Sequence, residues 1–597
     1  MKKRYLFILV TVLAVTACSS FRSGPKTEPA AEITTMAAFH AEMSGCQTCH
    51  ADGSKVTVSD SENHENEQCV SCHGGYEKMA NAALEFDPHT SHLGDINCTT
   101  CHKGHDAPQF YCNNCHSFNI EAMPFADVPK KAAWDRDWNQ EAIQKAIAAG
   151  PVEKTDVVVV GAGSTGFNAA LTAERKGAKI ILFEKAPFTG GNSMLAAGGI
   201  NAVGTPQQAK KGIKDSVDWF VEDTMKGGRY KNDEKLVRIM AEESADAVKW
   251  LESLGVNLDG LKRSGGARVQ RTHAPANGAS AGPQIIQTLR KVAKREHLDT
   301  RLNSRVEKLV LNDNREVVGV VVHGKHSGYY MVAADAVVLA TGGYGMNKEM
   351  IAWYRPTFAK MTSSNNITAT GDGIIMAKEI GASMTDIDWV QAHPTVGKDS
   401  RILISETVRG VGAIMVNTDG KRFVNELTTR DRASDAILKQ KEGYAWLVFD
   451  EQLIAKKKMV RGYEHLGMLK KADTVEGLAK MTGMSALPET IKAYNAYQST
   501  GKDLAFGRSD MPLNLTKPPF YAVRVAPGIH HTMGGVAIDP DSEVLDLQSW
   551  PIPGLYAAGE VTGGVHGFNR LGGNAIADTV VFGRRAGAHA AEYALKK

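Results

Sequence analysis

Four copies of one short motif carry the most specific chemistry in the sequence. Each copy has two cysteines separated by two residues and followed at once by a histidine: Cys46, Cys49 and His50; Cys69, Cys72 and His73; Cys98, Cys101 and His102; Cys112, Cys115 and His116. C-x-x-C-H is the attachment signature of c-type haem. Disulfides, zinc sites and redox dithiols also use paired cysteines, but none needs a histidine after every second cysteine. The sequence therefore predicts four covalent haems.

Each haem iron needs a second axial ligand, and the same stretch offers five further histidines: His40, His64, His89, His92 and His105. His64 lies in the polar run 61–67, so we interpret it as a solvated surface residue. Ligation by two histidines gives low-potential iron suited to electron transfer rather than oxygen binding. Residues 36–120 have few long apolar stretches, so the porphyrins must supply much of the core of this tetrahaem domain.

The first residues have the character of an export signal. Lys2, Lys3 and Arg4 precede a short apolar run over residues 5–15, and small residues then lead to Cys18. This resembles a bacterial lipoprotein signal in which Cys18 becomes the lipidated first residue; ordinary cleavage with Cys18 incidental is the alternative. We expect a signal peptide over 1–17 and a tether over 18–35. Both alternatives place the protein outside the cytoplasm.

The composition separates this exported segment from a larger body. All nine cysteines lie before residue 116 of 597, and 43% of the residues are hydrophobic and 23% charged. These values exclude a disordered, collagen-like or multi-span membrane protein. A net charge of +3 without a basic run gives no support for nucleic-acid binding. Residues 121–150, with two prolines and a helical pattern over 141–149, are predicted to be a linker.

A dinucleotide site follows the linker. A buried-type strand over 156–160 runs into Gly161, Ala162 and Gly163, and Gly166 opens a helical pattern. Glycines here permit the tight turn and let backbone N–H groups approach a pyrophosphate at the helix N-terminus. A second strand over 179–183 ends at Glu184, which is placed to bind a ribose hydroxyl.

Three later stretches favour FAD over NAD. They are GGNS at 190–193, a strand and glycine turn at 337–343, and a late strand ending in Gly-Glu at 559–560, followed by a helix over 574–587. Their order along one chain carries the argument. The chain leaves the first half near 390 and returns near 530. We therefore predict an α/β FAD-binding (Rossmann-like) domain over 151–390 and 530–597, with an inserted α+β capping domain over 391–529.

The combination of a tetrahaem N-terminus, an FAD domain and a cap resembles the periplasmic flavocytochrome c fumarate reductases over essentially the whole mature chain. The most specific matching pieces are QAHPT at 391–395, SETVRG at 405–410, TTRD at 428–431, HHTMGG at 530–535 and HGFNRLGG at 566–573. Related flavoprotein subunits usually link FAD to a histidine. Residues 191–198 contain none, so the resemblance implies non-covalent FAD here.

The resemblance also implies roles for individual residues. His40, His89, His92 and His105 match the distal haem ligands. Arg570 and His530 would hold one carboxylate of fumarate, and His393 and Ser405 the other, with Glu406 and Gly198 also at the substrate. Arg430 would donate the proton, and Glu406 and Arg409 would reprotonate it. The FAD contacts implied are Gly161, Ala162, Gly163, Gly166, Glu184, Asn192, Ser193, Ala197, Gly198, Thr341, Gly342, Asp372, Glu560, Arg570, Ala575 and Ile576.

This chemistry is physically reasonable. Hydride would pass from the flavin N5 to one alkene carbon and a proton from Arg430 to the other, while fixed cations hold the dianion. Burial among other cations would help an arginine to release a proton. Plainer alternatives remain: Arg430 and Asp431 as a surface ion pair, Glu406 and Arg409 as a helical salt bridge, and His531 as a structural neighbour.

The resemblance implies a fumarate reductase of anaerobic respiration, acting as a monomer. Its electron donor would be a quinol-oxidising membrane cytochrome or a small periplasmic cytochrome. Two other functions stay open. One is a reductase of another unsaturated carboxylate, such as urocanate or methacrylate. The other is an electron-carrying or ferric-reducing cytochrome with a secondary flavin domain.

Overall fold

A computed structural model describes residues 69–71, 73–80, 87–91, 93–94, 96–103, 109–114 and 139–597. The predicted signal peptide and tether lie outside these residues. So do nine of the predicted haem residues: His40, Cys46, Cys49, His50, Cys72, His92, His105, Cys115 and His116. Within the described residues, no helix combines the length and the apolar character needed to cross a membrane.

An eight-stranded sheet forms the base of the molecule. Its central strand β1 (Pro151–Val160) runs parallel to β2 (Ile180–Phe183) and to β9 (Gly328–Leu339). β19 (Pro551–Ala557) and β6 (Asp299–Arg301) extend the parallel part, and β7 (Ser304–Leu311), β8 (Val317–Gly324) and β18 (Glu543–Leu545) complete the sheet. Val157, Val158 and Val159 are fully buried, as expected for parallel strands covered on both faces. The predicted α/β fold is confirmed.

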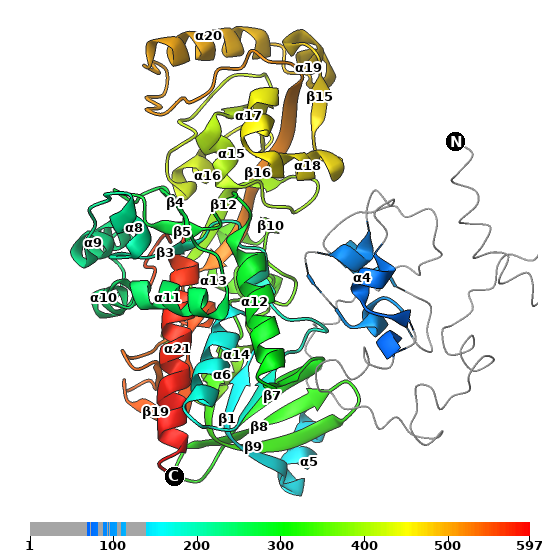
Figure 1. The fold of residues 1–597 in the computed structure, drawn as a ribbon, viewed down its shortest axis with the longest axis vertical. Helices are drawn as coiled ribbons and strands as arrows, with labels where there is room; N and C mark the ends of the chain where they lie inside the picture. Colours follow the sequence, from blue (N-terminus) through cyan, green and yellow to red (C-terminus); the bar gives the residue numbers. More distant parts are fainter. Residues whose placement is uncertain are drawn as a thin grey trace, which may run out of the picture.

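Three long helices, α6 (Ser164–Arg175), α12 (Ala281–Arg295) and α21 (Asn574–Ala594), lie side by side against this sheet (Figure 1). α6 and α21 pack closely because α21 presents glycines to its neighbour. A Cβ atom on Gly587 would lie 2.1 Å from the carbonyl oxygen of Ala169. This packing brings the beginnings of both helices to the carboxyl ends of the parallel strands, where ligands bind in open α/β sheets.

A second sheet builds the capping region, which forms the upper part of Figure 1. Its long strand β16 (Phe520–Thr532) pairs with β14 (Ala445–Asp450), β12 (Val390–Gly397), β10 (Thr362–Ser363) and β15 (Lys470–Ala472), and β13 (Ile414–Val416) pairs with β14. The sheet is covered by α15 (Glu406–Val411), α16 (Arg430–Leu438), α17 (Glu451–Lys456), α18 (Arg461–His465), α19 (Val475–Thr482) and α20 (Leu487–Thr500). The predicted cap boundaries, which stay predictions, fall on β12 and β16, and these strands are antiparallel partners.

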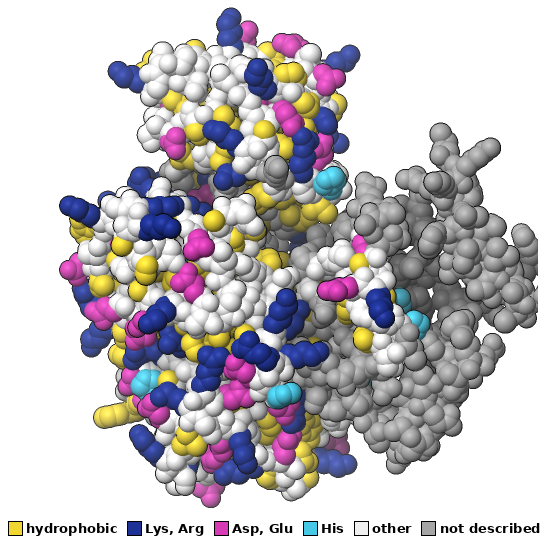
Figure 2. All heavy atoms as spheres, in the orientation of Figure 1, with side chains coloured by type: hydrophobic (Ala, Val, Ile, Leu, Met, Phe, Trp, Pro, Cys, Tyr) yellow, Lys and Arg dark blue, Asp and Glu magenta, His cyan; other side chains and the backbone are white. Residues whose placement is uncertain are grey.

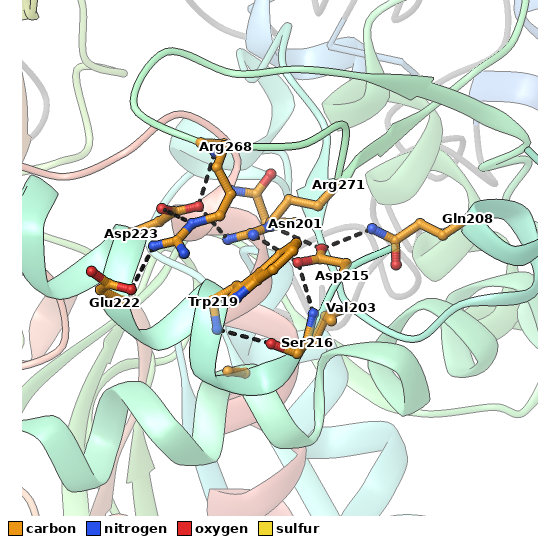
Figure 3. A network of polar contacts seen from close by, with 12 residues as sticks. Asn201, Val203, Gln208, Asp215, Ser216, Trp219, Glu222, Asp223, Arg268 and Arg271 are labelled. Carbon is orange, nitrogen blue, oxygen red and sulfur yellow. Dashed lines mark hydrogen bonds and ion pairs between the residues drawn. The ribbon is translucent and has the colours of Figure 1, made fainter. Parts of the chain in front are cut away.

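A helical lobe lies beside the junction of the two sheets. It contains α8 (Pro206–Lys210), α9 (Val217–Gly227), α10 (Glu234–Glu242) and α11 (Ser244–Leu254), with the small sheet β3 (Ile200–Asn201), β5 (Thr272–Ala274) and β4 (Gly260–Lys262). Arg271 is buried here and pairs with Asp215 at 2.8 Å and Asp223 at 3.1 Å (Figure 3). Arg268 also pairs with Asp223, at 2.7 Å. This network fixes the loop before β5 to α9.

The described part of the cytochrome region consists of short elements. They are α4 (Tyr76–Met79) and the 3-10 turns η2 (Pro88–Thr90), η3 (Cys98–Thr100) and η4 (Tyr111–Asn114), which lie to the right of the main body in Figure 1. The linker helix predicted over 141–149 is present as α5 (Gln140–Ala149). On the face shown in Figure 2, basic and acidic side chains of the described residues are interspersed, in line with the small net charge.

Candidate active site and cofactor sites

The glycine turn after β1 has the shape that the sequence predicts. Gly161 has a φ of +102°, and a Cβ atom there would lie 2.6 Å from the carbonyl oxygen of Ala340. A Cβ on Gly166 would lie 1.8 Å from the carbonyl oxygen of Gly161. Only glycine therefore fits at both positions. The first turn of α6 is left open to an anion, because its backbone N–H groups point out of the helix end.

Glu184 holds this loop together. Its carboxylate accepts hydrogen bonds from the backbone N–H groups of Ala162 and Ala186, both at 2.9 Å. Burial raises the pKa of Glu184, and the two N–H donors oppose that rise. The carboxylate also lines a cavity with Thr341, whose buried hydroxyl has no hydrogen-bond partner among the described residues. The residues around this cavity fit the adenosine and phosphate part of FAD.

Asp372 lines the same cavity and forms ion pairs with two basic side chains. Burial alone would raise its pKa, but Lys185 at 2.9 Å and Arg305 at 3.1 Å hold that pKa well below its usual range. The carboxylate is therefore charged at neutral pH. It stands at the start of α14 (Asp372–Glu379), where a helix end favours negative charge.

A larger cavity of about 570 Å³ brings the two predicted sets of residues together. Asn192, Ser193, Ala197, Gly198, Glu560, Ala575 and Ile576, which we expect to contact FAD, line it together with His393, Ser405, Glu406, Arg409, Arg430, His530 and Arg570, which we expect at the substrate. Its walls come from both halves of the FAD domain and from the cap. The cavity is thus one continuous space in which a flavin ring and a small acid would meet.

Arg430 is the first residue of α16 and lies in this cavity. Its Nε and Nη2 atoms donate to Oε2 of Glu406 at 3.0 and 2.9 Å, and Nη1 donates to Oε1 of Gln391 at 3.0 Å. The alternative of an Arg430–Asp431 surface pair does not describe this arrangement, because Asp431 pairs with Arg229 instead.

Glu406 and Arg409 both lie on α15 but do not form a close helical pair. Arg409 Nη2 is 4.0 Å from Glu406, whereas Arg430 is 2.9 Å from it. Burial would raise the pKa of Glu406, but Arg430 and Arg409 lower it to about 2. Burial lowers the pKa of Arg409, and its Nε and Nη2 atoms have no hydrogen-bond partner among the described residues. The three residues lie in the order needed for a proton relay.

His393 and His530 both line the cavity and pack edge-to-face, with ring centroids 5.1 Å apart at 64°. Burial lowers both pKa values well below 6.5, and Arg430 lowers them further, so both rings are neutral at pH 7. The backbone N–H of Thr395 donates to Nδ1 of His393 at 3.2 Å. The ring proton of His393 must then sit on Nε2, where it can be donated to a ligand.

Arg570 lines the same cavity beside Arg430. Burial and the neighbouring Arg430 lower its pKa to about 9, and its buried Nε has no hydrogen-bond partner among the described residues. Two buried arginines this close need an anion between or beside them. An unsatisfied donor of Arg570 is therefore available to a carboxylate.

Three residues of the site were missed by the sequence analysis as functional positions. Oε1 of Gln391 accepts from Arg430 at 3.0 Å and from Arg570 at 3.2 Å, so one amide links the two arginines. Ser364 places its hydroxyl 2.8 Å from Nδ1 of His530. Arg508, fully buried, donates to the carbonyl oxygen of Arg409 at 2.7 Å. Only Gln391 belongs to one of the sequence motifs, and a glutamine by itself does not indicate a contact with two arginines.

Ser405 and His531 have mainly structural contacts. Ser405 is the N-cap of α15, and its hydroxyl accepts from the N–H of Thr407 at 3.3 Å while its edge remains in the cavity wall. His531 places Nδ1 3.4 Å from Glu560 and packs edge-on against His566. His531 also lines the cavity, and its buried Nε2 has no hydrogen-bond partner among the described residues, so its interpretation as a structural neighbour stays a prediction.

The described haem residues fit iron ligation. The rings of His89 and His102 are nearly parallel, at 9°, with centroids 6.4 Å apart. Metal–imidazole bonds are about 2 Å long, and two such bonds together with the two ring radii span a centroid separation of this size. His102 directly follows Cys101, and the N–H of His102 donates to the carbonyl oxygen of Cys98, which closes the attachment loop. The geometry fits a pair of axial ligands on one haem.

Comparison with known proteins places the chain in a family. A cytochrome c3 model matches residues 39–117, and an FAD binding domain model matches residues 156–576. The chain is 68% identical to a probable fumarate reductase of Shewanella frigidimarina (strain NCIMB 400), over 100% of both chains. It is 43% identical to a cytochrome-type fumarate reductase of the same strain, over 94% of this chain and 95% of the relative.

The solved structure of the open conformation of a flavocytochrome c3 fumarate reductase matches 94% of this chain and 100% of its own, with 70% identity and a TM-score of 0.85. Fold and site thus define a flavoprotein with a haem-bearing N-terminal domain. The chain belongs to the flavocytochrome c fumarate reductase family. The predicted cofactors, FAD and c-type haem, are confirmed by the two domain matches; the non-covalent state of FAD stays a prediction.

Proposed function

We propose that the protein reduces fumarate to succinate as the last step of an anaerobic electron-transfer chain. One observation carries the proposal: Arg409, Arg430 and Arg570 line one cavity together with two neutral histidines. The carboxylate that lies beside Arg430, that of Glu406, is already paired with it. The excess positive charge calls for an anionic ligand. A small dicarboxylate satisfies both ends of the pocket at once.

The side chains have separate tasks in this reaction. Arg570 and His530 hold one carboxylate, and His393 and Ser405 hold the other, with the Nε2–H of His393 as donor. Fork-shaped arginine contacts fix the plane of a carboxylate as well as its position. When bound, FAD supplies a hydride and the haems supply the electrons that replenish it. Cations on the carboxylates stabilise the negative charge that develops on the substrate.

Arg430 gives its proton to the second alkene carbon. Glu406, ionised at rest, takes a proton from Arg409 and passes it to Arg430, and Arg409 regains a proton from water. The 2.9 Å contact between Arg430 and Glu406 supports the transfer from Glu406 to Arg430. Burial of Arg409 supports the transfer from Arg409 to Glu406, because a buried guanidinium releases its proton more readily. Closure of the cap excludes water, so that the proton reaches only the substrate.

The further proposals concern the surroundings of the enzyme. The export signal places the protein in the periplasm, with Cys18 as a lipid anchor or as an incidental residue; the mass of the mature N-terminus separates the two. A quinol-oxidising membrane cytochrome or a small periplasmic cytochrome supplies the electrons.

A steady-state assay with a reduced viologen dye tests the function. The holoprotein should oxidise the dye rapidly with fumarate and slowly with urocanate or methacrylate, because the mono-acid methacrylate cannot engage both ends of the pocket. Succinate oxidation, run beside it, should proceed through the same site. Faster turnover of urocanate or methacrylate would instead identify a different unsaturated acid as substrate. Rapid reduction of chelated iron with negligible fumarate turnover would identify an electron-carrier function.

A further inference from the structure

One face of α12 packs along residues 189–193, the loop that lines the expected flavin site and is called the flavin loop below. Residues 282, 286 and 290 are four apart and therefore lie on the same side of the helix. A Cβ on Gly282 would lie 2.1 Å from the carbonyl oxygen of Ser193, and a Cβ on Gly190 would lie 3.0 Å from the side chain of Ile286. The helix thus touches the loop at two points with almost no free space.

The third residue of this face, Arg290, reaches beyond the loop. Its Nε donates to the hydroxyl of Thr189 at 2.9 Å, and Nη2 lies 3.3 Å from the carbonyl oxygen of the same residue. Nη2 also donates to the carbonyl oxygen of Leu93, in the cytochrome domain, at 3.1 Å. One guanidinium therefore joins the flavin loop to the haem-bearing domain.

The cytochrome side is shaped to receive Arg290. Gly94 has a φ of +72°, and a Cβ there would lie 2.3 Å from Nη1 of Arg290. A side chain at residue 94 would displace the guanidinium. The turn at Leu93 and Gly94 thus presents its carbonyl oxygen and leaves room for the arginine.

An apolar contact surrounds this polar one. Leu93 and Ile96 of the cytochrome domain pack with Ala186, Phe188 and Ile367 of the FAD domain. Cys101 and Tyr111 pack against the same cluster, and Tyr111 meets Phe188 edge-on with centroids 5.4 Å apart. Cys101 belongs to the third haem motif, and Tyr111 directly precedes Cys112 of the fourth. The contact therefore lies where haem attachment meets the flavin loop.

We propose that Arg290 is a positioning residue for electron transfer, which fixes the cytochrome domain against the flavin loop. This inference rests on the proposed function, in which two ferrous irons become ferric for each fumarate, and the two electrons pass through FAD and, with two protons, convert fumarate to succinate. Transfer through protein falls steeply with distance. A loosened contact therefore slows delivery from haem to flavin without altering the substrate pocket.

The test is the Arg290→Gln holoprotein, with Arg290→Lys as the conservative variant. Arg295→Gln is the matched control, because Arg295 lies on the same helix, is exposed and pairs only with Glu296 among the described residues. Dithionite-reduced enzyme is mixed with fumarate, and haem reoxidation is followed by absorbance. Succinate oxidation by a phenazine dye, which takes electrons from the flavin directly, is measured on the same samples.

We expect haem reoxidation to slow several-fold in Arg290→Gln and less in Arg290→Lys, with the control unchanged and the dye-linked rate unchanged in all. Hydrogen exchange over residues 93–103 should accelerate in Arg290→Gln and stay unchanged in the control Arg295→Gln. Gly94→Ala attacks the same contact from the other side, so it should produce the same effects, and the double variant should be no slower than either single one.

A wild-type reoxidation rate in Arg290→Gln or, if that variant does not fold, in Gly94→Ala would overturn the inference. An equal loss of the dye-linked rate would also overturn it, since the flavin site itself would then be disturbed. If wild-type haems stay reduced after fumarate is added, the proposed function fails, and the exchange measurement still decides the role of Arg290.

Discussion

At the scale of single residues, the geometry of the pocket depends on the acceptors that hold its arginines in place. Gln391 shares one oxygen between Arg430 and Arg570, and Glu406 takes the remaining face of Arg430. Each guanidinium keeps a fixed plane in this arrangement. A lysine has the charge but only a point contact, so it cannot reproduce three directed hydrogen bonds to two acceptors.

The first prediction concerns Arg430→Lys. Fumarate reduction should fall by about 10²–10⁴-fold, the usual contribution of a positioned acid, while haem and FAD content stay at wild-type levels. The viologen assay and the absorption spectrum measure both. Arg432→Lys, two residues further along α16 and exposed, is the control and should keep full activity. Near-normal turnover of Arg430→Lys would refute its role as the proton donor.

The sequence predicts residues whose chemistry is local and misses those whose role depends on distant partners. Gly161 and Gly166 can be predicted because a strand, a turn and a helix surround them within a few residues. Gln391, Ser364 and Arg508 cannot, since their partners lie far away in the chain: Gln391 and Arg570 are 179 positions apart, and Arg508 and Arg409 are 99 positions apart. Only the packed fold brings them together.

At the scale of elements, most predicted strands and helices are present, and the differences follow from packing. The predicted strand over 156–160 begins earlier, at Pro151, because it pairs with β9 along its whole length. The helix predicted over 574–587 continues to Ala594. A glycine normally signals a helix end, but Gly587 is a contact point against Ala169. Propensity alone cannot distinguish these two uses.

The second prediction concerns Gly282→Ala in α12. Alanine is favoured over glycine in a helix by about 1 kcal/mol, yet here its Cβ would lie 2.1 Å from the backbone of Ser193. The flavin loop must shift, so we expect several-fold weaker FAD retention, measured as flavin released on dilution. Gly462→Ala in α18, where a Cβ meets no atom within 4 Å, is the control. Unchanged retention in Gly282→Ala would show that α12 does not set the loop position.

At the scale of the whole molecule, the candidate substrate site is shared between two bodies. Arg570 follows the last strand of the first sheet, while His393 and His530 lie on the paired strands β12 and β16 of the capping sheet, and Ser405, Glu406 and Arg430 lie at α15 and α16. Ligand bound between them adds contacts to both. Its binding free energy therefore stabilises the folded chain.

The third prediction is that succinate raises the apparent Tm of the holoprotein. A ligand at 100 times its Kd stabilises the native state by about 2.7 kcal/mol, so the increase should grow with the logarithm of succinate concentration. Butyrate, which lacks the second carboxylate, should have little effect, and Arg570→Gln should abolish the response. Equal shifts with butyrate would show that the pocket does not select for two carboxylates. Thermal scans followed by tryptophan fluorescence provide the measurement.

The pairing of β12 with β16 has a consequence for how such enzymes diversify. Residues His393 and Gly528 face each other across this pair, although 134 residues lie between them in the chain. The intervening segment thus begins and ends on two strands that are direct neighbours in the sheet. A single recombination event in an ancestral gene could therefore replace the whole inserted segment. Such an exchange leaves the flavin-binding residues unchanged and alters the part of the pocket that selects the substrate.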